Sequence, residues 1–285
     1  MNRRTPFPRV FWVANLIEVL ERFAYYGIYF SFGIYLTELG YSRNELGIIQ
    51  TLFLLLSYIL PLFSGTLADK YGFKKLLIVS YLAYLPAILL LILTKSFSGI
   101  ALTMLAIGFA AGIFKPLISG TVRAVTDKTN TSLGFGIFYA MVNIGGSFGP
   151  IVAGKLRAIS WDYAFYAAAV SIGFMFLVTL LFYKEPEREI EGATLGEKLR
   201  EVVVVLSDVK FAVFLFLLGA FFWVPFWAFF NLCALYVDSN LDTVRLYQDI
   251  RSVLGPGVAD FLSQEQDGVR RILGETISHT GWIIM

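Results

Sequence analysis

Long windows with few charges constrain this chain more than any other feature. Each is about 20 residues or longer, the length that a helix needs to cross roughly 30 Å of hydrocarbon. These windows cover residues 9–37, 46–68, 76–94, 98–124, 133–155, 163–183 and 211–237. Charged residues make up 15% of the chain, well below the usual quarter, so lipid suits it as a solvent. The sequence therefore predicts an all-α integral membrane protein.

Basic residues are distributed unevenly over the segments that join these windows. If the N-terminus is cytoplasmic, the cytoplasmic segments contain Arg3, Arg4, Arg9, Lys70, Lys74, Lys75, Arg123, Lys128, Lys184, Arg188, Lys198, Arg200 and Lys210. The opposite connections between the first six windows contain only Arg43, Lys95, Lys155 and Arg157. Because positive charge favours the cytoplasmic side, we expect a multi-pass protein of the cell membrane with a cytoplasmic N-terminus. Topology explains the basic residues, and nucleic-acid binding has no support.

Loop length and charge divide the chain into four parts. Residues 1–183 are six windows joined by short loops, which predicts a six-helix transmembrane bundle. Residues 184–210 are charged and form a predicted cytoplasmic linker, with a helical pattern over 195–206. Residues 211–237 are a predicted seventh helix, and residues 238–285 a polar extracytoplasmic segment that leads to a truncated eighth helix. We expect the sequence to be a fragment of a paired-bundle protein; the alternative is a natural seven-span protein with a soluble tail.

Two pairs of glycines lie four residues apart within predicted spans. They are Gly108 with Gly112 and Gly145 with Gly149. This small-xxx-small spacing lets helix backbones approach closely in a membrane. We therefore predict that these glycines serve helix packing.

Polar residues share one face of the first predicted helix, close to the bilayer centre. Their positions follow i, i+3, i+4, i+7, i+8 and i+11: Glu18, Glu21, Arg22, Tyr25, Tyr26 and Tyr29. The acidic and basic members begin about ten residues into the span, roughly 15 Å deep at 1.5 Å per residue. Three unpaired charges there would cost roughly 8–10 kcal/mol, so each needs a compensating partner.

Partners for these charges are available at the same depth. Glu18 and Arg22 can pair at i,i+4 with the acid N-terminal. For Glu21 a candidate partner is Lys115 in the fourth window, which lies about as far from the cytoplasmic end of its own helix. Two further polar side chains fall at that level, Tyr58 and Asn143.

A purely structural ion network that joins helices is the alternative interpretation of this cluster. Buried ion pairs stabilise poorly compared with apolar packing, because desolvation can exceed the Coulomb attraction. Ionisable clusters inside a membrane therefore indicate a functional site.

Four segments carry a resemblance to a known family. Residues 18–27 match the pattern E-x-x-E-R-F-x-Y-Y-G, residues 112–116 read Gly-Ile-Phe-Lys-Pro, and residues 138–145 contain Phe-Tyr followed by Asn and Gly. Residues 65–75 contain Gly65, Leu-Ala-Asp, Gly72 and two lysines. The first three segments resemble the proton-dependent oligopeptide transporter family of the major facilitator superfamily, and the fourth is similar to a loop shared by the whole superfamily.

The resemblance implies a fold and roles for individual residues. The fold would be the N-terminal six-helix bundle of the superfamily plus the first helix of the C-terminal bundle. Arg22 and Lys115 would bind the substrate carboxylate, and Glu18 and Glu21 would take part in proton coupling. The remaining residues of the substrate site would be Tyr25, Tyr26, Tyr58 and Asn143. A gating loop would contain Gly65, Asp69, Gly72, Lys74 and Lys75.

One departure from the family pattern lies in the seventh window. After residues 226–230, where the family has Glu-Gln, this sequence has Asn231-Leu232. By resemblance the missing glutamate is associated with the amino end of the peptide. A narrower or different anionic cargo therefore remains open.

These observations predict a proton-coupled symporter for di- or tripeptides or similar small carboxylate solutes. Its partners would be the lipid bilayer, the substrate and protons, with no cofactor other than the coupling proton and no metal. A superfamily transporter of another solute class and a peptide-binding membrane receptor remain as alternatives. An enzyme is disfavoured because the one histidine, His279, lies in the polar tail and no metal-ligand or nucleophile–base pattern appears.

Overall fold

The computed structural model describes residues 5–187, 195–223, 225, 236–237, 240–266, 268–272 and 276–277. The chain divides into two compact units, Met1–Ala193 and Thr194–Met285. The division falls within residues 184–210, the segment in which the sequence places a linker.

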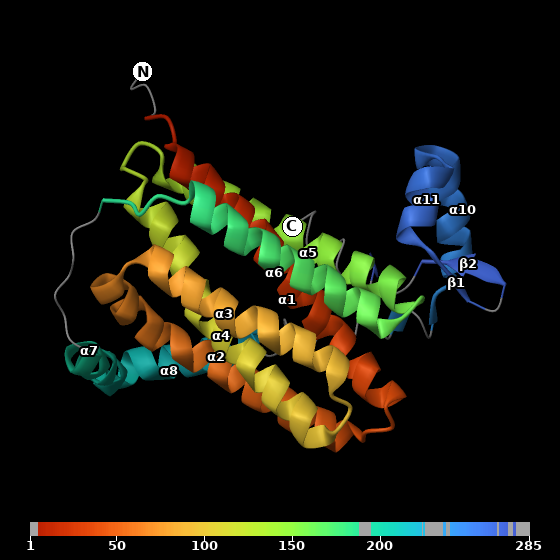
Figure 1. The fold of residues 1–285 in the computed structure, drawn as a ribbon, viewed down its shortest axis with the longest axis horizontal. Coiled ribbons are helices and arrows are strands. Elements are labelled where there is room, and N and C mark those ends of the chain that lie inside the picture. The colour runs from red at the N-terminus through yellow and green to blue at the C-terminus, as the bar shows by residue number, and fades with distance from the viewer. Residues whose placement is uncertain are drawn as a thin grey trace. The chain divides into compact units, whose positions relative to one another are not determined.

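Six long helices make up the described part of the first unit (Figure 1). They are α1 (Arg9–Glu38), α2 (Arg43–Tyr71), α3 (Phe73–Leu93), α4 (Phe97–Ala124), α5 (Thr131–Arg157) and α6 (Trp161–Phe182). Five of them, α2 to α6, are long and apolar enough to cross a membrane. α1 is equally long, but Glu18, Glu21 and Arg22 lie in its middle. A helix is thus present at each of the first six predicted spans.

Side-chain caps explain why several of these helices begin where they do. Ser42 accepts a hydrogen bond from the Glu45 amide while the Glu45 carboxylate accepts one from the Ser42 amide, which is a capping box. Ser96 accepts a hydrogen bond from the amide of Gly99 at the start of α4. Ser160 accepts one from the amide of Asp162 at the start of α6. These caps satisfy helix amides that have no partner within the helix.

The helices pack as two groups of three that meet along their length (Figure 1). α1, α5 and α6 contact one another, as do α2, α3 and α4. The groups meet through contacts of α3 with α6 and of α1 with α4. The N-terminal end of α1, the α2–α3 and α4–α5 connections and the end of α6 all lie at one end of this bundle. The first helix, α1, therefore packs mainly against α5 and α6, which lie far from it in sequence.

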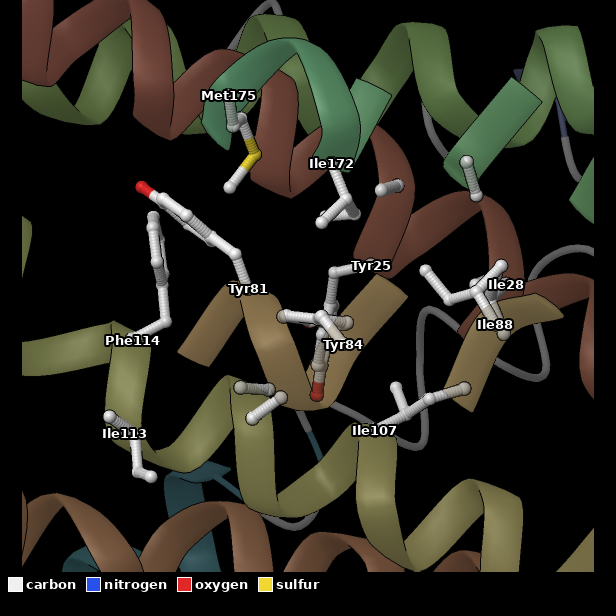
Figure 2. Close-up of a cluster of buried hydrophobic side chains, with 14 of the residues drawn as sticks. Tyr25, Ile28, Tyr81, Tyr84, Ile88, Ile107, Ile113, Phe114, Ile172 and Met175 are labelled. Atoms are coloured by element: carbon white, nitrogen blue, oxygen red, sulfur yellow. The ribbon is translucent and has the colours of Figure 1, made fainter. Parts of the chain in front are cut away.

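A mixed aromatic and aliphatic core fills the junction between the two groups. Figure 2 shows Tyr81 and Tyr84 of α3 lying between Phe114 of α4 and Ile172 and Met175 of α6. Tyr84, Phe114, Ile172 and Met175 are fully buried. The Tyr81 hydroxyl lies 3.0 Å from the Thr179 hydroxyl, so its polar end has a partner. This core fixes α3 and α4 beside the charged middle of α1.

The described elements of the second unit are helices followed by a small hairpin. Its elements are α7 (Leu195–Ser207), α8 (Val209–Leu218), the π-helical η1 (Gly219–Trp223), α10 (Thr243–Leu254), α11 (Pro256–Leu262), β1 (Gln264–Gln266) and β2 (Val269–Arg271). α7 coincides with the helical pattern seen over 195–206. α8 and η1 together cover only Val209–Trp223, and most of the remainder of the predicted seventh span lies outside the described residues.

Within the polar segment of this unit, α10, α11 and the hairpin share a small core of Tyr247, Ala259 and Ile272. The Tyr247 hydroxyl donates to Asp260 at 2.8 Å, and β1 pairs antiparallel with β2. The sequence did not predict this hairpin. Asn231, Cys233, His279 and the predicted eighth helix lie outside the described residues.

Candidate functional site

The polar face of α1 is turned into the bundle. Glu18 is 2% exposed, Glu21 is fully buried, and Arg22 and Tyr25 are 7% and 5% exposed. Their spacing of three and four residues places all four on one side of the helix. The charges therefore lie inside protein and away from the lipid-facing surface.

Arg22 joins the two glutamates. Its Nε atom is 2.7 Å from Oε1 of Glu18 and 3.0 Å from Oε2 of Glu21. The predicted pairing of Glu18 with Arg22 is confirmed. Two carboxylates share one guanidinium, so this triad carries an excess negative charge when all three groups are ionised.

The two glutamates differ in their remaining contacts. Oε1 of Glu21 accepts a hydrogen bond of 2.8 Å from the hydroxyl of Tyr84, a fully buried residue of α3. Oε2 of Glu18 is buried and accepts no hydrogen bond from any residue in the described part of the chain. Oε2 of Glu21 likewise accepts no hydrogen bond from the described residues, although it lies 3.0 Å from Nε of Arg22. A buried carboxylate oxygen without a hydrogen-bond donor is costly when charged, so neither acid is fully satisfied.

Lys115 lies on the other side of the site and has neutral partners. Its Nζ atom donates to Oγ of Ser57 at 2.7 Å and lies 4.4 Å from the ring centroid of Tyr58 and 5.3 Å from that of Tyr25. Aromatic faces attract cations at these distances. The predicted Lys115–Glu21 ion pair does not form among the described residues, because Arg22 and Tyr84 already occupy the Glu21 carboxylate.

Tyr25 lies between the two cations. The guanidinium carbon of Arg22 is 5.5 Å from its ring centroid, and the Lys115 ammonium is 5.3 Å from the same ring. The guanidinium carbon of Arg22 also lies 6.0 Å from the ring of Tyr26. The Tyr25 ring is thus within cation–π distance of both the α1 triad and the lysine of α4.

Seven of the eight residues predicted for the central site are joined by these contacts. They are Glu18, Glu21, Arg22, Tyr25, Tyr26, Tyr58 and Lys115. Asn143 is half-buried on α5, and its amide forms no hydrogen bond with the described residues. Tyr58 is 60% exposed, so this side of the site opens out of the bundle.

Close packing of α5 on α1 fixes the position of Arg22. A Cβ atom on Gly145 would lie 2.3 Å from the carbonyl oxygen of Val19 and 2.7 Å from Cβ of Arg22. A Cβ atom on Gly149 would lie 2.3 Å from the carbonyl oxygen of Phe23. Only glycine permits this approach, so the predicted packing role is confirmed.

A second close contact joins α4 to α2 and positions Lys115. A Cβ atom on Gly108 would lie 3.0 Å from the carbonyl oxygen of Phe53, and one on Gly112 would lie 2.7 Å from Cβ of Leu60. Lys115 follows Gly112 by one helical turn and reaches Ser57 on the same neighbouring helix. Arg22 and Lys115 therefore each lie beside a close helix contact that glycine permits.

Comparison with known proteins identifies the family of this arrangement. The model of the major facilitator superfamily matches residues 14–249. The chain belongs to the major facilitator superfamily. Residues 18–115, which contain the buried ions, lie wholly within the matched region.

Curated relatives of this major facilitator chain include two kinds of named protein. Dipeptide and tripeptide permease A of Escherichia coli K12 is 28% identical over 190 residues, covering 65% of this chain and 37% of the relative. Quinolone resistance protein NorA of Staphylococcus aureus is 26% identical over 155 residues, covering 54% of this chain and 40% of the relative. The chain thus spans about two fifths of these relatives.

Solved structures show the same fold. A peptide transporter of the oligopeptide transporter family in complex with sulfate matches with a TM-score of 0.64 and 18% identity, over 97% of this chain and 66% of that one. A structure concerned with substrate recognition in proton-dependent oligopeptide transporters matches with a TM-score of 0.59 and 23% identity, over 72% of this chain and 48% of that one. These structures show the fold, and the family model confirms the superfamily to which the motifs pointed.

The loop motif of this major facilitator bundle lies apart from the buried ions. Gly65 and Asp69 are in the last two turns of α2, Gly72 joins α2 to α3 with φ +94°, and Lys74 and Lys75 begin α3. Lys75 precedes Tyr84 by nine residues, about 14 Å along a helix. The structure therefore separates the predicted gating residues from the central site.

Two residues of the central site escaped the sequence analysis, Ser57 and Tyr84. Both are fully buried, and each places a hydroxyl on a charged group. Tyr84 could have been found from its depth, since it lies about eleven residues into α3, level with the middle of the bundle. Among the described residues, no cluster of His, Cys, Asp and Glu could bind a metal ion.

Proposed function

We propose that this chain forms part of a proton-coupled symporter for di- or tripeptides or similar small solutes that carry a carboxylate. The observation that supports the proposal most is the buried triad of Glu18, Arg22 and Glu21 beside Lys115. The E. coli permease and the solved peptide transporters support the peptide class.

Charge balance provides the coupling. With Glu18, Glu21, Arg22 and Lys115 all ionised, the formal charges of the site sum to zero. A substrate carboxylate adds one negative charge, and an unpaired charge at the centre of a membrane costs about 2.5–3.5 kcal/mol on insertion scales. Uptake of one proton by a glutamate restores neutrality. Substrate and proton binding therefore favour each other.

The two cations take different parts in carboxylate binding. Among the residues that the structure describes, Lys115 has neutral contacts alone, so it is a point charge that the substrate engages first. Arg22 can present two parallel donors to a carboxylate, but Glu18 and Glu21 already contact it. When the substrate carboxylate binds Arg22, it displaces a glutamate, and this glutamate becomes the proton acceptor.

Alternating access would complete the cycle. Rocking of this bundle against a second bundle would expose the site to each side in turn, with Asp69 to Lys75 acting as a gating loop. We propose a cell-membrane location with the N-terminus cytoplasmic, supported by the basic residues at the end of the bundle that carries the α2–α3 loop.

Uptake by the whole protein in proteoliposomes tests this function. Glu21→Gln should abolish uphill accumulation driven by a proton gradient but retain substrate exchange at equal proton concentration. Glu187→Gln, which alters an exposed acid, should leave both unchanged. Full proton-driven accumulation by the Glu21→Gln variant would overturn the coupling assignment.

A transporter of another solute class is the second candidate. Similarity to the quinolone resistance protein and the Asn231-Leu232 sequence support it. Competition separates the two candidates. Inhibition of uptake by dipeptides is expected of the first. Inhibition by quinolones but not by dipeptides would favour the second.

A further inference from the structure

We propose that Glu185 is a positioning residue for the α2–α3 loop, which it connects to the start of the linker. Glu185 lies three residues after the end of α6 and is exposed. Its Oε1 atom accepts a hydrogen bond of 2.7 Å from the amide of Phe73, and its Oε2 atom accepts one of 2.8 Å from the amide of Lys74. One carboxylate thus binds the first two amides of α3.

Helix geometry explains why this contact matters. The first amides of a helix have no partner within it, and the N-terminal end of the helix dipole favours a negative charge. The Gly72 residue before α3 has no side chain to act as a cap. Glu185 provides the cap from 112 positions away in sequence.

The glycine of the loop motif is needed for this contact. Gly72 adopts φ +94°, a conformation that other residues rarely adopt. A Cβ atom there would also lie 3.3 Å from the carboxyl carbon of Glu185. Both the backbone turn and the approach of the carboxylate therefore favour glycine at this position.

A third hydrogen bond runs between the same two segments. Nζ of Lys74 donates to the carbonyl oxygen of Leu180 in the last turn of α6 at 3.1 Å. The end of α6 and the beginning of α3 are thus joined by three hydrogen bonds from two side chains. Pro186, which follows Glu185 directly, is buried.

The consequence concerns movement of the linker. A force on the segment after Glu185 acts on the start of α3, and hence on a loop that we propose to be gating. This transport role rests on the proposed function, but the capping contact does not. Glu187 is a matched control, because it is exposed, two residues away and hydrogen-bonded to none of the described residues.

Hydrogen exchange of the purified protein tests the contact. Glu185→Ala should accelerate exchange at the amides of Phe73 and Lys74 by about 2- to 30-fold, the range expected from losing a helix cap. Glu187→Ala should not. If Glu185→Ala fails to fold, Glu185→Gln serves instead, since its amide group keeps one acceptor oxygen and should protect only one of the two amides. Unchanged exchange, or equal acceleration in both alanine variants, would overturn the proposal.

Uptake by the whole protein tests the consequence. Glu185→Ala should lower the maximal rate of uptake several-fold and leave KM unchanged, while Glu187→Ala matches the unsubstituted protein. Accelerated exchange with an unchanged maximal rate would overturn the positioning role in transport. Failure of the unsubstituted protein to transport peptides would contradict the proposed function and leave the exchange result standing.

Discussion

The ammonium of Lys115 hydrogen-bonds to the hydroxyl of Ser57 at 2.7 Å, while both nearby glutamates contact Arg22. The two cations of the site are therefore in different electrostatic states. Arg22 is compensated twice, whereas Lys115 has no anionic partner among the residues that the structure describes. An entering anion gains more from Lys115, because it need not displace a carboxylate there.

Replacement of Ser57 by alanine should destabilise the protein through Lys115. The ammonium would lose its hydroxyl partner, and hydrogen bonds to charged groups contribute about 1.5–3 kcal/mol. Ser64→Ala on the same helix is the control, because that buried hydroxyl donates to neutral backbone carbonyl oxygens, and its loss should cost about 0.5–1.5 kcal/mol. Equilibrium unfolding in detergent measures both.

A double-mutant cycle assigns the Ser57 effect to the lysine. In a Lys115→Met background, the additional loss from Ser57→Ala should shrink to that of the Ser64 control. Equal losses in both backgrounds would show that Ser57 acts through packing alone.

Tyr84→Phe should leave the Glu21 carboxylate short of a donor. Glu21 is fully buried, and an unsatisfied buried acceptor costs about 1–3 kcal/mol of unfolding free energy. Tyr81→Phe on the same helix removes a bond between two neutral hydroxyls and should cost about 0.5–1.5 kcal/mol. A Tyr84 effect no larger than the Tyr81 effect would argue against an ionised Glu21.

Sequence reasoning found the depth of the charged residues and the pairing of Glu18 with Arg22, but not the partner of Lys115. A residue's distance from the end of a span follows from the helical rise, which places Glu21 and Lys115 at one level. The direction in which each side chain points follows from helix packing, which the sequence does not show. Lys115 consequently meets Ser57 and Tyr58 of α2 instead of Glu21.

The site residues that the sequence analysis missed carry neutral hydroxyl groups. Serine and tyrosine enter a membrane helix at little cost, so Ser57 and Tyr84 leave no signal in hydropathy. The cap of α3 by Glu185 was equally invisible, because it joins segments 112 residues apart. Composition and spacing predicted the helices and the ions, and tertiary packing determined what those ions touch.

Asp127 in the α4–α5 connection gives a prediction on pH. The Thr129 hydroxyl at 2.6 Å, the Thr5 side chain and the Thr129 amide at 2.7 Å lower the pKa of its carboxyl to about 2. The folded state therefore favours the ionised form, so the stabilisation is present above pH 3.8, the ordinary value, and is lost as the pH falls towards 2. Carbon-detected NMR titration of the carboxyl group checks this. Thr129→Ala should raise the pKa only partly, since the amide remains; no change would contradict the assigned cause.

Gly145→Ala should disrupt the site by separating α1 from α5. The new Cβ atom would lie 2.3 Å from the Val19 carbonyl oxygen and 2.7 Å from Cβ of Arg22, and neither backbone can yield without moving its helix. Overpacking of this kind costs about 1–3 kcal/mol or more. Gly136→Ala is the control, because a Cβ atom at that exposed position of α5 meets nothing within 4 Å and should be neutral or slightly stabilising. Because Arg22 lies at this contact, the Gly145 variant should also weaken binding of carboxylate substrates more than its loss of stability explains, as measured on the folded fraction. Equal unfolding free energies for the two alanine variants would show that the helices can separate without cost, which the packed geometry does not allow.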